Sequence, residues 1–290
     1  MSSAAFDAPG GVMAHIRSVA SSLLPTEQAV AEVLLGRPEA VIEMSSQQVA
    51  EAAGASRATV VRTCQSLGFT GYQQLRVMLA RDLGPAGVAA GATAGEPQTA
   101  AHVVRAAFAS VGESLPAMTA LLSDADLTRA IETLARARRL LVTGNGLSAP
   151  LAQLCAQRLT ALGLPADSPT DGIAQQVAAR HMSPDDVLLV ISGSGANETT
   201  MRCAAAAREA GAAVILITAF GRSPLTAAAD ISLVVGMRDP TFRDELTVTT
   251  RIPQFILIEG LIAGLSRRLG AAGEAAHLAT MAVVAENLTE

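Results

Sequence analysis

Apolar residues follow two different patterns along the chain, one before residue 84 and one after residue 98. From residue 12 to about residue 83 they recur at the spacing of packed amphipathic helices. Local signals mark helix ends within this stretch. Pro25 suits a first helical position, Ser45 and Gln48 form a capping box, and Ser56 can cap a further helix. The first part of the chain is therefore predicted to be an all-α domain.

After residue 98 short continuous apolar runs alternate with helical stretches. The runs, which end in glycine turns or small residues, are residues 140–144, 187–191, 214–218 and 231–235. The helical stretches are residues 99–122, 126–137, 149–162, 199–210 and 254 to the C-terminus. Continuous apolar strands separated by helices indicate a parallel sheet covered on both faces. We therefore predict a three-layer α-β-α sandwich of flavodoxin-like type.

The segment between these two parts has the composition of a linker. Residues 84–98 are rich in Gly, Ala and Pro, which is typical of connections between domains. The predicted organisation is a helical domain over residues 1–83, a linker over residues 84–98 and an α/β domain over residues 99–290.

Composition removes several classes of function. All 21 basic residues are arginine, which excludes Schiff-base and lysine general-base chemistry. The three cysteines and four histidines are scattered without metal-ligand spacing, so we expect no metal and no cofactor. No apolar run approaches the roughly 18 residues that span a bilayer, and no signal peptide is visible. We expect a cytoplasmic protein without membrane contact.

Positive charge is concentrated in one region of an otherwise acidic chain. The formal net charge is −5, yet the stretch from Gly54 to Arg81 contains Arg57, Arg62 and Arg76 and no acidic residue. Binding to nucleic-acid phosphates requires a positive potential only locally. The charge distribution is therefore compatible with a nucleic-acid partner.

Residues 46–62 have the spacing of a helix-turn-helix. Ala50 is small enough for two helices to cross closely, and Gly54 can adopt the positive φ of a tight turn. The second helix is predicted to expose Arg57, Thr59 and Arg62, whose side chains can reach base edges and phosphates in a DNA major groove. The pattern alone also fits a plain helical hairpin with a solvated polar face.

The wider stretch resembles the N-terminal domain of the RpiR family of transcriptional regulators. The matching residues are 25–27, 49–54, Ser56, 59–62, 67–69 and 71–76. This resemblance implies binding to a double-stranded DNA operator, and it adds Ser56, Tyr72 and Arg76 to the predicted DNA contacts. Thr63 departs from the family pattern, which usually has a large apolar residue there.

Two glycine-rich turns that follow predicted strands carry serines. The first contains Gly144, Gly146 and Ser148, and the second is Ser192-Gly193-Ser194-Gly195. Glycine lets the backbone approach an oxyanion, helix N-termini present free N–H groups, and serine hydroxyls complete the shell. Carboxyl ends of parallel strands are where open α/β sheets bind ligands. Each turn by itself could equally be a simple helix cap.

Together with their surroundings these turns resemble the sugar isomerase (SIS) domain over residues 112–270. The resemblance implies a phosphosugar effector, places Asn197 and Ser223 in the same site, and implies pairing through this domain into a homodimer or a dimer of dimers. The matching residues are 143–148, Asp186, 191–195, 211–214, 217–218, 223–225, 229–230 and 251–254. Leu147, Asn197 and Ala219 depart from the usual SIS residues, each altering one polar group near the expected ligand.

The alternative is a phosphosugar isomerase, since SIS domains also occur in such enzymes. Proton abstraction would need a base, for which Glu198 and His181 are the candidates. Both fit simpler interpretations, as a first-turn helix acid and a polar loop residue. An isomerase would also have no use for the arginine-bearing helix, and a structural adaptor would explain neither motif. We therefore predict a regulator without catalytic residues.

Overall fold

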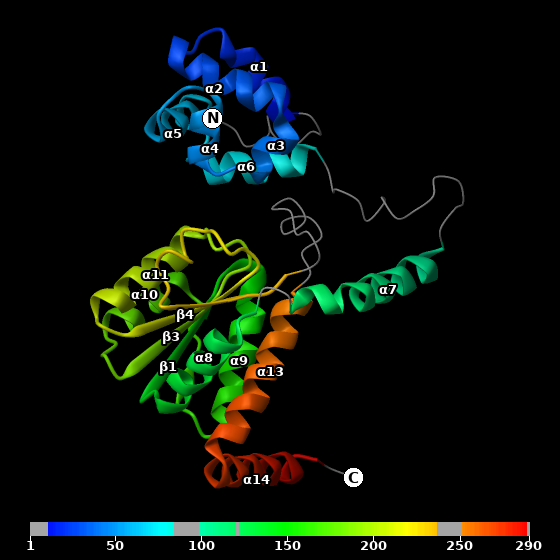
Figure 1. The fold of residues 1–290 in the computed structure, drawn as a ribbon, viewed down its shortest axis with the longest axis vertical. Coiled ribbons are helices and arrows are strands. Elements are labelled where there is room, and N and C mark those ends of the chain that lie inside the picture. The colour runs from blue at the N-terminus through cyan, green and yellow to red at the C-terminus, as the bar shows by residue number, and fades with distance from the viewer. Residues whose placement is uncertain (1–10, 84–98, 120–121, 237–250, 289–290) are drawn as a thin grey trace. The chain divides into compact units, whose positions relative to one another are not determined.

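The computed structural model describes residues 11–83, 99–119, 122–236 and 251–288 (Figure 1). These residues belong to two compact units, one that contains residues 11–83 and one that contains the remainder. The predicted linker, residues 84–98, lies outside the described residues.

The described part of the N-terminal unit consists of helices only. They are α1 (Gly11–Ala20), α2 (Pro25–Gly36), α3 (Pro38–Glu43), α4 (Ser46–Ala52), α5 (Arg57–Ser66) and α6 (Tyr72–Asp82). The predicted caps are confirmed. Ser45 Oγ accepts from the Gln48 amide at 3.2 Å, Gln48 Oε1 accepts from the Ser45 amide at 2.8 Å, and Ser56 Oγ accepts from the Thr59 amide at 3.0 Å. Gly54 has the positive φ, 60°, that the turn between α4 and α5 requires.

The second unit is built on a five-stranded parallel sheet of order β2-β1-β3-β4-β5. This is the flavodoxin-like order, in which the strand order reverses between the neighbouring strands β1 and β3. The strands are β1 (Arg139–Gly144), β2 (Ala166–Asp167), β3 (Asp186–Ile191), β4 (Ala213–Thr218) and β5 (Ile231–Val234). The register pairs Gly144 with Ile191, so β1 and β3 end side by side.

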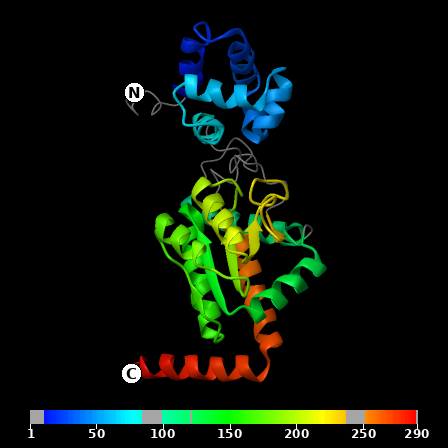
Figure 2. The same cartoon turned by 90° about the vertical axis from the view of Figure 1, so that its left-hand side faces the viewer.

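Helices cover both faces of the sheet, as Figures 1 and 2 show. One face packs against α8 (Asp124–Arg136), α9 (Ala149–Ala161) and α13 (Ile252–Leu269), and the other against α10 (Gly172–Arg180) and α11 (Glu198–Glu209). Both interfaces are built from aliphatic residues and small alanines, as the low aromatic content requires. The predicted three-layer sandwich is confirmed.

The sequence prediction missed three local features. The short strand β2 and the helix α10 were not foreseen, although Asp171 caps α10 by accepting from the Ile173 and Ala174 amides. The C-terminal helical stretch is two helices, α13 and α14 (Ala271–Glu286), which are separated by Gly270 with φ of 55°. The remaining helix, α7 (Ala100–Met118), precedes α8.

A buried carboxylate ties the amino ends of two strands together. Asp186, at the start of β3, is fully buried and accepts hydrogen bonds from the Ser183 amide (2.8 Å) and hydroxyl (3.1 Å). Arg138 and Arg139 lie 2.9 and 3.4 Å from its carboxylate. Burial by itself raises the pKa of Asp186, but the Ser183 hydrogen bonds and the two guanidinium groups outweigh it and hold the pKa below the ordinary value of 3.8.

This lowered pKa predicts an acid-sensitive C-terminal unit. A carboxylate with a depressed folded-state pKa stabilises the fold above its unfolded pKa, and that contribution is lost as the pH falls through the folded value. We expect Asp186→Asn to lower the free energy of unfolding at pH 7 by about 1.5–3 kcal/mol, the range for hydrogen bonds to charged groups. We also expect a weaker loss of stability below pH of about 4 in the variant. Urea unfolding followed by circular dichroism at pH 7 and pH 3 measures both, and equal stability at pH 7 would contradict the assignment.

Candidate functional sites

The exposed face of α5 carries two of the predicted DNA-contacting arginines. Arg57 and Arg62 are both exposed, together with Ala58 and Gln65 on the same helix. Arg57 Nε donates to the hydroxyl of Ser46, at the start of α4, at 3.1 Å. Arg62 also donates to the Thr59 hydroxyl at 3.4 Å. The second helix of a helix-turn-helix that exposes two guanidinium groups has the shape and charge to enter a major groove.

Thr59 does not lie on this exposed face, which corrects the sequence prediction. It is 6% exposed, and its Oγ1 lies 2.9 Å from Ser56 Oγ. Thr63 lies one turn after Thr59 and is fully buried. Its hydroxyl donates to the Thr59 carbonyl at 2.9 Å. Ser56 and Thr59 therefore serve the start and the packing of α5. The bond from the Thr63 hydroxyl to the Thr59 carbonyl satisfies the buried hydroxyl, which explains how a threonine is accommodated where the family usually has an apolar residue.

Tyr72 and Arg76, also predicted to touch DNA, are buried at 4% and 7% exposure. Both side chains bind backbone carbonyls near the end of α3. The Tyr72 hydroxyl donates to the Val41 carbonyl, and Arg76 Nε donates to the Ile42 carbonyl, each at 2.8 Å. The Arg76 guanidinium lies 5.8 Å from the centre of the Tyr72 ring. Burial raises the pKa of Tyr72, against the opposing effect of Arg76, and burial lowers the pKa of Arg76. The pair caps α3 from within the unit.

This arrangement predicts a stability effect for Arg76. Arg76→Met keeps the aliphatic stem but leaves the Ile42 carbonyl without its charged donor. We expect the N-terminal unit to lose about 1.5–3 kcal/mol in free energy of unfolding. Tyr72 is the single tyrosine of a chain without tryptophan, so intrinsic fluorescence of the full chain reports on this unit alone.

The control for Arg76→Met is Arg17→Met, which removes an exposed arginine of the same unit. The control is expected to unfold like wild type in urea. If Arg76→Met also unfolds like wild type while binding DNA less tightly, Arg76 is a DNA contact after all.

The serines of the two glycine turns follow the carboxyl ends of the neighbouring strands β1 and β3. Ser148 and Ser192 are 3% and 5% exposed, and Ser194 is half-buried. Ser148 immediately precedes α9, and the Ser192 turn leads into α11. Within the described part of the chain, none of these three hydroxyls has a hydrogen-bond partner. These hydroxyls are therefore available for hydrogen bonds to a ligand.

Glycine is needed in these turns for two different reasons. A Cβ on Gly144 would lie 2.6 Å from the backbone oxygen of Ser148, so only glycine allows the turn after β1 to close. Gly146 and Gly195 have positive φ values of 57° and 62°. A side chain on Gly195 would also collide with the Ser223 hydroxyl, which shows that the turns after β3 and β4 lie in contact.

Two other residues predicted to bind the effector have their side-chain oxygens engaged within the fold. Asn197 Oδ1 accepts from the amide and the hydroxyl of Thr200, both at 3.0 Å, and so caps α11. Ser223 Oγ accepts from the Thr226 amide at 3.2 Å. Asn197 is exposed, so its amide nitrogen faces solvent. Both side chains therefore already act as caps within the fold.

A polar network that sequence reasoning missed braces the two serine turns. Asn145 Nδ2 donates to Gln175 Oε1 at 3.0 Å and to Thr200 Oγ1 at 2.9 Å. Gln175, fully buried in α10, donates in turn to the Pro169 carbonyl at 2.9 Å. The position of Asn145 between two glycines was the one available signal, while nothing in the local sequence marks Gln175.

The candidate bases of the isomerase hypothesis lie elsewhere or are paired. His181 precedes β3 at the amino edge of the sheet, where its carbonyl accepts from Arg139 at 2.8 Å. Glu198 is 70% exposed in its side chain and forms an ion pair with Arg202. Among the described residues, neither side chain forms a hydrogen bond or ion pair with Ser148, Ser192 or Ser194.

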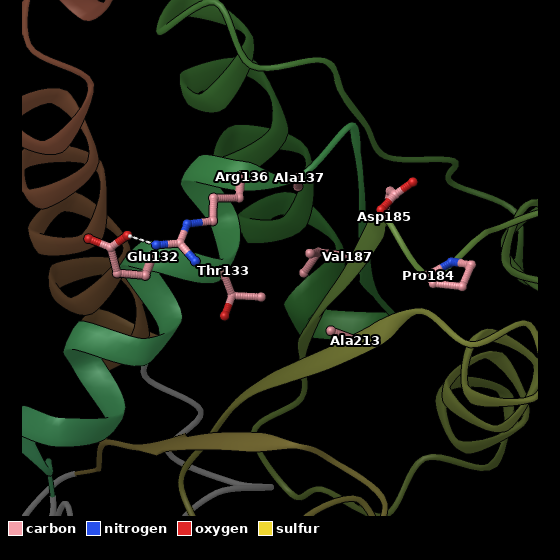
Figure 3. Close-up of a pocket in the computed structure, with 8 residues that line it drawn as sticks. All are labelled: Glu132, Thr133, Arg136, Ala137, Pro184, Asp185, Val187 and Ala213. Carbon is pink, nitrogen blue, oxygen red and sulfur yellow. Dashed lines mark ion pairs between the residues drawn. The ribbon is translucent and has the colours of Figure 1, made fainter.

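A pocket of about 270 Å³ also opens at the amino edge (Figure 3). It is lined by residues of α8 and by residues at or next to the starts of β3 and β4, including Asp185, Val187 and Ala213. Its arginine, Arg136, is paired with Glu132 at 3.3 Å. Ligands of open α/β sheets bind at the opposite edge, so we assign no function to this pocket.

Comparisons with known proteins match both units. The model of the helix-turn-helix domain of the rpiR family matches residues 10–86, and the SIS domain model matches residues 133–261. A transcriptional regulator of Caldanaerobacter subterraneus is 30% identical over 249 residues, which cover 86% of this chain and 88% of the relative. The chain belongs to the rpiR family of transcriptional regulators.

Other relatives of this rpiR-family regulator agree. The regulator HexR of Pseudomonas aeruginosa is 30% identical over 89% of the chain and 90% of its own length. The Vibrio vulnificus NanR protein, solved in complex with ManNAc-6P, shares the fold with a TM-score of 0.75 at 22% identity, covering 96% of this chain and all of that one. Among the described residues of the regulator, no helix is long and apolar enough to cross a membrane, and no cluster of three metal-binding side chains occurs.

Proposed function

We propose that this regulator binds an operator through α5 and that a phosphorylated sugar, held at the carboxyl edge of the sheet, changes its affinity for DNA. The observation that carries the proposal is the set of three unpartnered hydroxyls of Ser148, Ser192 and Ser194 in a closely packed edge. A phosphate group would supply the acceptors that these hydroxyls lack.

The surroundings favour an anion over a neutral ligand. Ser148 leads directly into α9 and the Ser192 turn leads into α11, so two helix N-termini begin at this edge. Helix N-termini stabilise negative charge, and glycine turns expose backbone N–H groups. The chain contains no lysine, so hydroxyls and backbone amides carry this role. The NanR complex with ManNAc-6P supports a sugar phosphate as the ligand.

We further propose that the protein has no isomerase activity. Relatives such as HexR are named transcriptional regulators. Of the two candidate bases, His181 lies at the opposite edge of the sheet from the serine turns, and Glu198 is ion-paired with Arg202. A protein that binds chromosomal DNA acts in the bacterial cytoplasm. A homodimer or a dimer of dimers would present two copies of α5 to the half-sites of an inverted repeat.

A thermal-shift screen against a library of phosphosugars, with the unphosphorylated sugars as controls, tests the proposal. A ligand at free concentration L that binds only the folded state stabilises it by RT ln(1 + L/Kd), so the melting temperature rises with the logarithm of the ligand concentration. We expect at least one phosphosugar to stabilise the C-terminal unit and its unphosphorylated form to have no effect. Stabilisation by neither form, or turnover of the phosphosugar by the pure protein, would contradict the proposal.

A further inference from the structure

Side chains link the turn after β1, residues 145–148, to the turn after β3, residues 192–197. The strand ladder between β1 and β3 ends with the pair Gly144 and Ile191. Beyond that pair, no hydrogen bond joins the β1 turn directly to the β3 turn in the described part of the chain. The position of one turn relative to the other therefore depends, past the strand ends, on side chains that reach both.

Asn145, the first residue of the β1 turn, is at the centre of this brace. Its amide nitrogen Nδ2 donates to Gln175 Oε1 at 3.0 Å and to Thr200 Oγ1 at 2.9 Å. Gln175 belongs to α10 and Thr200 to α11, so a single amide group connects the β1 turn to two helices. Both N–H groups of the amide are used, which completes the bonding capacity of this nitrogen.

The partners of Asn145 fix the direction of each bond in the brace. Thr200 Oγ1 donates its single proton to Asn197 Oδ1 at 3.0 Å, so it can only accept from Asn145. Gln175 Nε2 donates to the Pro169 carbonyl at 2.9 Å, so the Gln175 Oε1 atom is the one that accepts. The Asn145 amide therefore has one orientation, with its nitrogen toward both helices.

Each end of the brace acts on a turn that carries proposed ligand serines. The Asn145 carbonyl accepts from the Ser148 amide at 3.2 Å, so the same residue closes the turn that presents Ser148. At the other end, Asn197 follows Ser194 by three residues and receives the Thr200 bond within the β3 turn. The brace therefore connects the two halves of the proposed phosphate site.

The brace lies inside the C-terminal unit, where its hydrogen bonds are shielded from water. Gln175 and Thr200 are 0% and 1% exposed. Helices α10 and α11 approach each other closely where they begin, since a Cβ on Gly172 would lie 2.5 Å from Thr199 Cγ2. This close approach lets both helices reach the same amide group. In surroundings of low dielectric constant, a fully paired network rigidifies the groups that it joins.

We propose that Asn145 is the positioning residue of the effector site, which holds the β1 and β3 turns in the arrangement that a phosphate group requires before any effector binds. This rests on the proposed function, because it takes the serines of the two turns to be the effector's ligands. Asn145 acts through the two turns and not by contact with the effector. A preformed shell reduces the entropy that binding would otherwise lose in ordering the turns.

The test compares effector binding by full-length Asn145→Ala and Thr200→Val with that of wild type, by isothermal titration calorimetry. The probe is ManNAc-6P or, where wild type does not bind it, the phosphosugar that stabilises wild type most in the thermal-shift screen. Asn145→Ala removes the centre of the brace, and Thr200→Val removes one hydroxyl at nearly constant shape. Each should raise Kd by about tenfold or more, as loss of outer-shell hydrogen-bond partners does at metal sites.

Two control variants separate positioning from a general loss of stability. Thr200→Ser keeps the hydroxyl that accepts from Asn145, so it should bind nearly as tightly as wild type. Asp186→Asn destabilises the same unit from the amino edge of the sheet, away from both turns, and should leave Kd within about threefold of wild type. A loss of affinity in Asp186→Asn equal to that in Asn145→Ala would show that Asn145 is only structural.

A double-mutant cycle with Ser148→Ala gives a measurement that a loss of stability does not change. Ser148→Ala should raise Kd at least about tenfold in the wild-type background, the effect of losing one hydrogen bond to a charged group. In the Asn145→Ala background it should raise Kd less than about threefold, because Ser148 is no longer held where it reaches the phosphate. Equal effects in the two backgrounds would overturn the proposal, as would wild-type affinity in both Asn145→Ala and Thr200→Val.

Failure of this proposal is distinguishable from failure of the proposed function. If wild type binds no phosphosugar, the proposed function is wrong and the role of Asn145 falls with it. If wild type binds and both brace variants bind equally well, only the role of Asn145 is wrong. Melting without ligand, followed by circular dichroism, shows whether each variant is folded. Asn145→Ser, whose side chain is too short to reach both helices, replaces Asn145→Ala if the alanine variant does not fold.

Discussion

Replacing both Ser192 and Ser194 by alanine will raise the Kd for the effector at least 30-fold. The two hydroxyls have no partner in the described residues, so their loss removes ligand hydrogen bonds without breaking any bond of the fold. Each hydrogen bond to a charged group contributes about 1.5–3 kcal/mol, and two together contribute about 3–6 kcal/mol. Isothermal titration calorimetry with the best phosphosugar from the screen measures the change.

The matched control is Ser223→Ala, which removes a hydroxyl from the adjacent turn. Ser223 Oγ accepts from the Thr226 amide and donates its own proton to Thr226 Oγ1 at 3.4 Å, so its removal should change the effector Kd by no more than about threefold. A larger loss would return Ser223 to the ligand shell, where the SIS resemblance placed it.

The double variant should keep its DNA affinity without effector and lose its response to effector. An effector changes DNA affinity only through its different affinities for the two states of the protein. A DNA titration with and without the phosphosugar, on wild type and the double variant, tests this. An unchanged effector response in the variant would refute the phosphate site, and loss of effector-free DNA binding would refute the separation of the two functions.

Removing the two exposed arginines of α5 will have the largest effect on DNA binding. Arg57→Ala and Arg62→Ala should each cost about 1–3 kcal/mol if the side chain reads a base edge. A contact to phosphate alone would instead weaken binding to all sequences and reduce the salt dependence. The double variant should therefore bind the operator at least 30-fold more weakly. Fluorescence anisotropy on operator and unrelated DNA, at two salt concentrations, separates base reading from phosphate contact.

The control for the arginine pair is Arg37→Ala, which removes one exposed charge from the same unit away from α5. Its effect on operator affinity should be small. Wild-type affinity in both Arg57→Ala and Arg62→Ala would show that α5 is not the reading helix.

The buried thiols need no functional explanation. Cys64, Cys155 and Cys203 are all buried, and burial raises the pKa of each, to about 12 for Cys64 and Cys155 and about 11 for Cys203. Thiolates are the reactive form, so none of the three is prepared for chemistry at neutral pH. This agrees with their interpretation as small apolar residues.

The sequence by itself determined the division into a helical and an α/β part, the caps of α4 and α5 and the parallel sheet. These features depend on residues that are neighbours in the chain. A capping box needs only Ser45 and Gln48, and a strand buried on both faces reads as an apolar run wherever it lies. The glycine turns and their serines were found for the same reason, since each turn is a local conformation.

Only the tertiary structure decided which polar residues face outward and which residues meet across the sheet. Thr59, Tyr72 and Arg76 look like DNA contacts in sequence, but their side chains are engaged by carbonyls and hydroxyls contributed by packing within the unit. The brace from Asn145 to Gln175 joins residues 30 positions apart, and local patterns carry no information about such contacts. Periodicity gives the face of a helix, whereas burial depends on what other helices place against it.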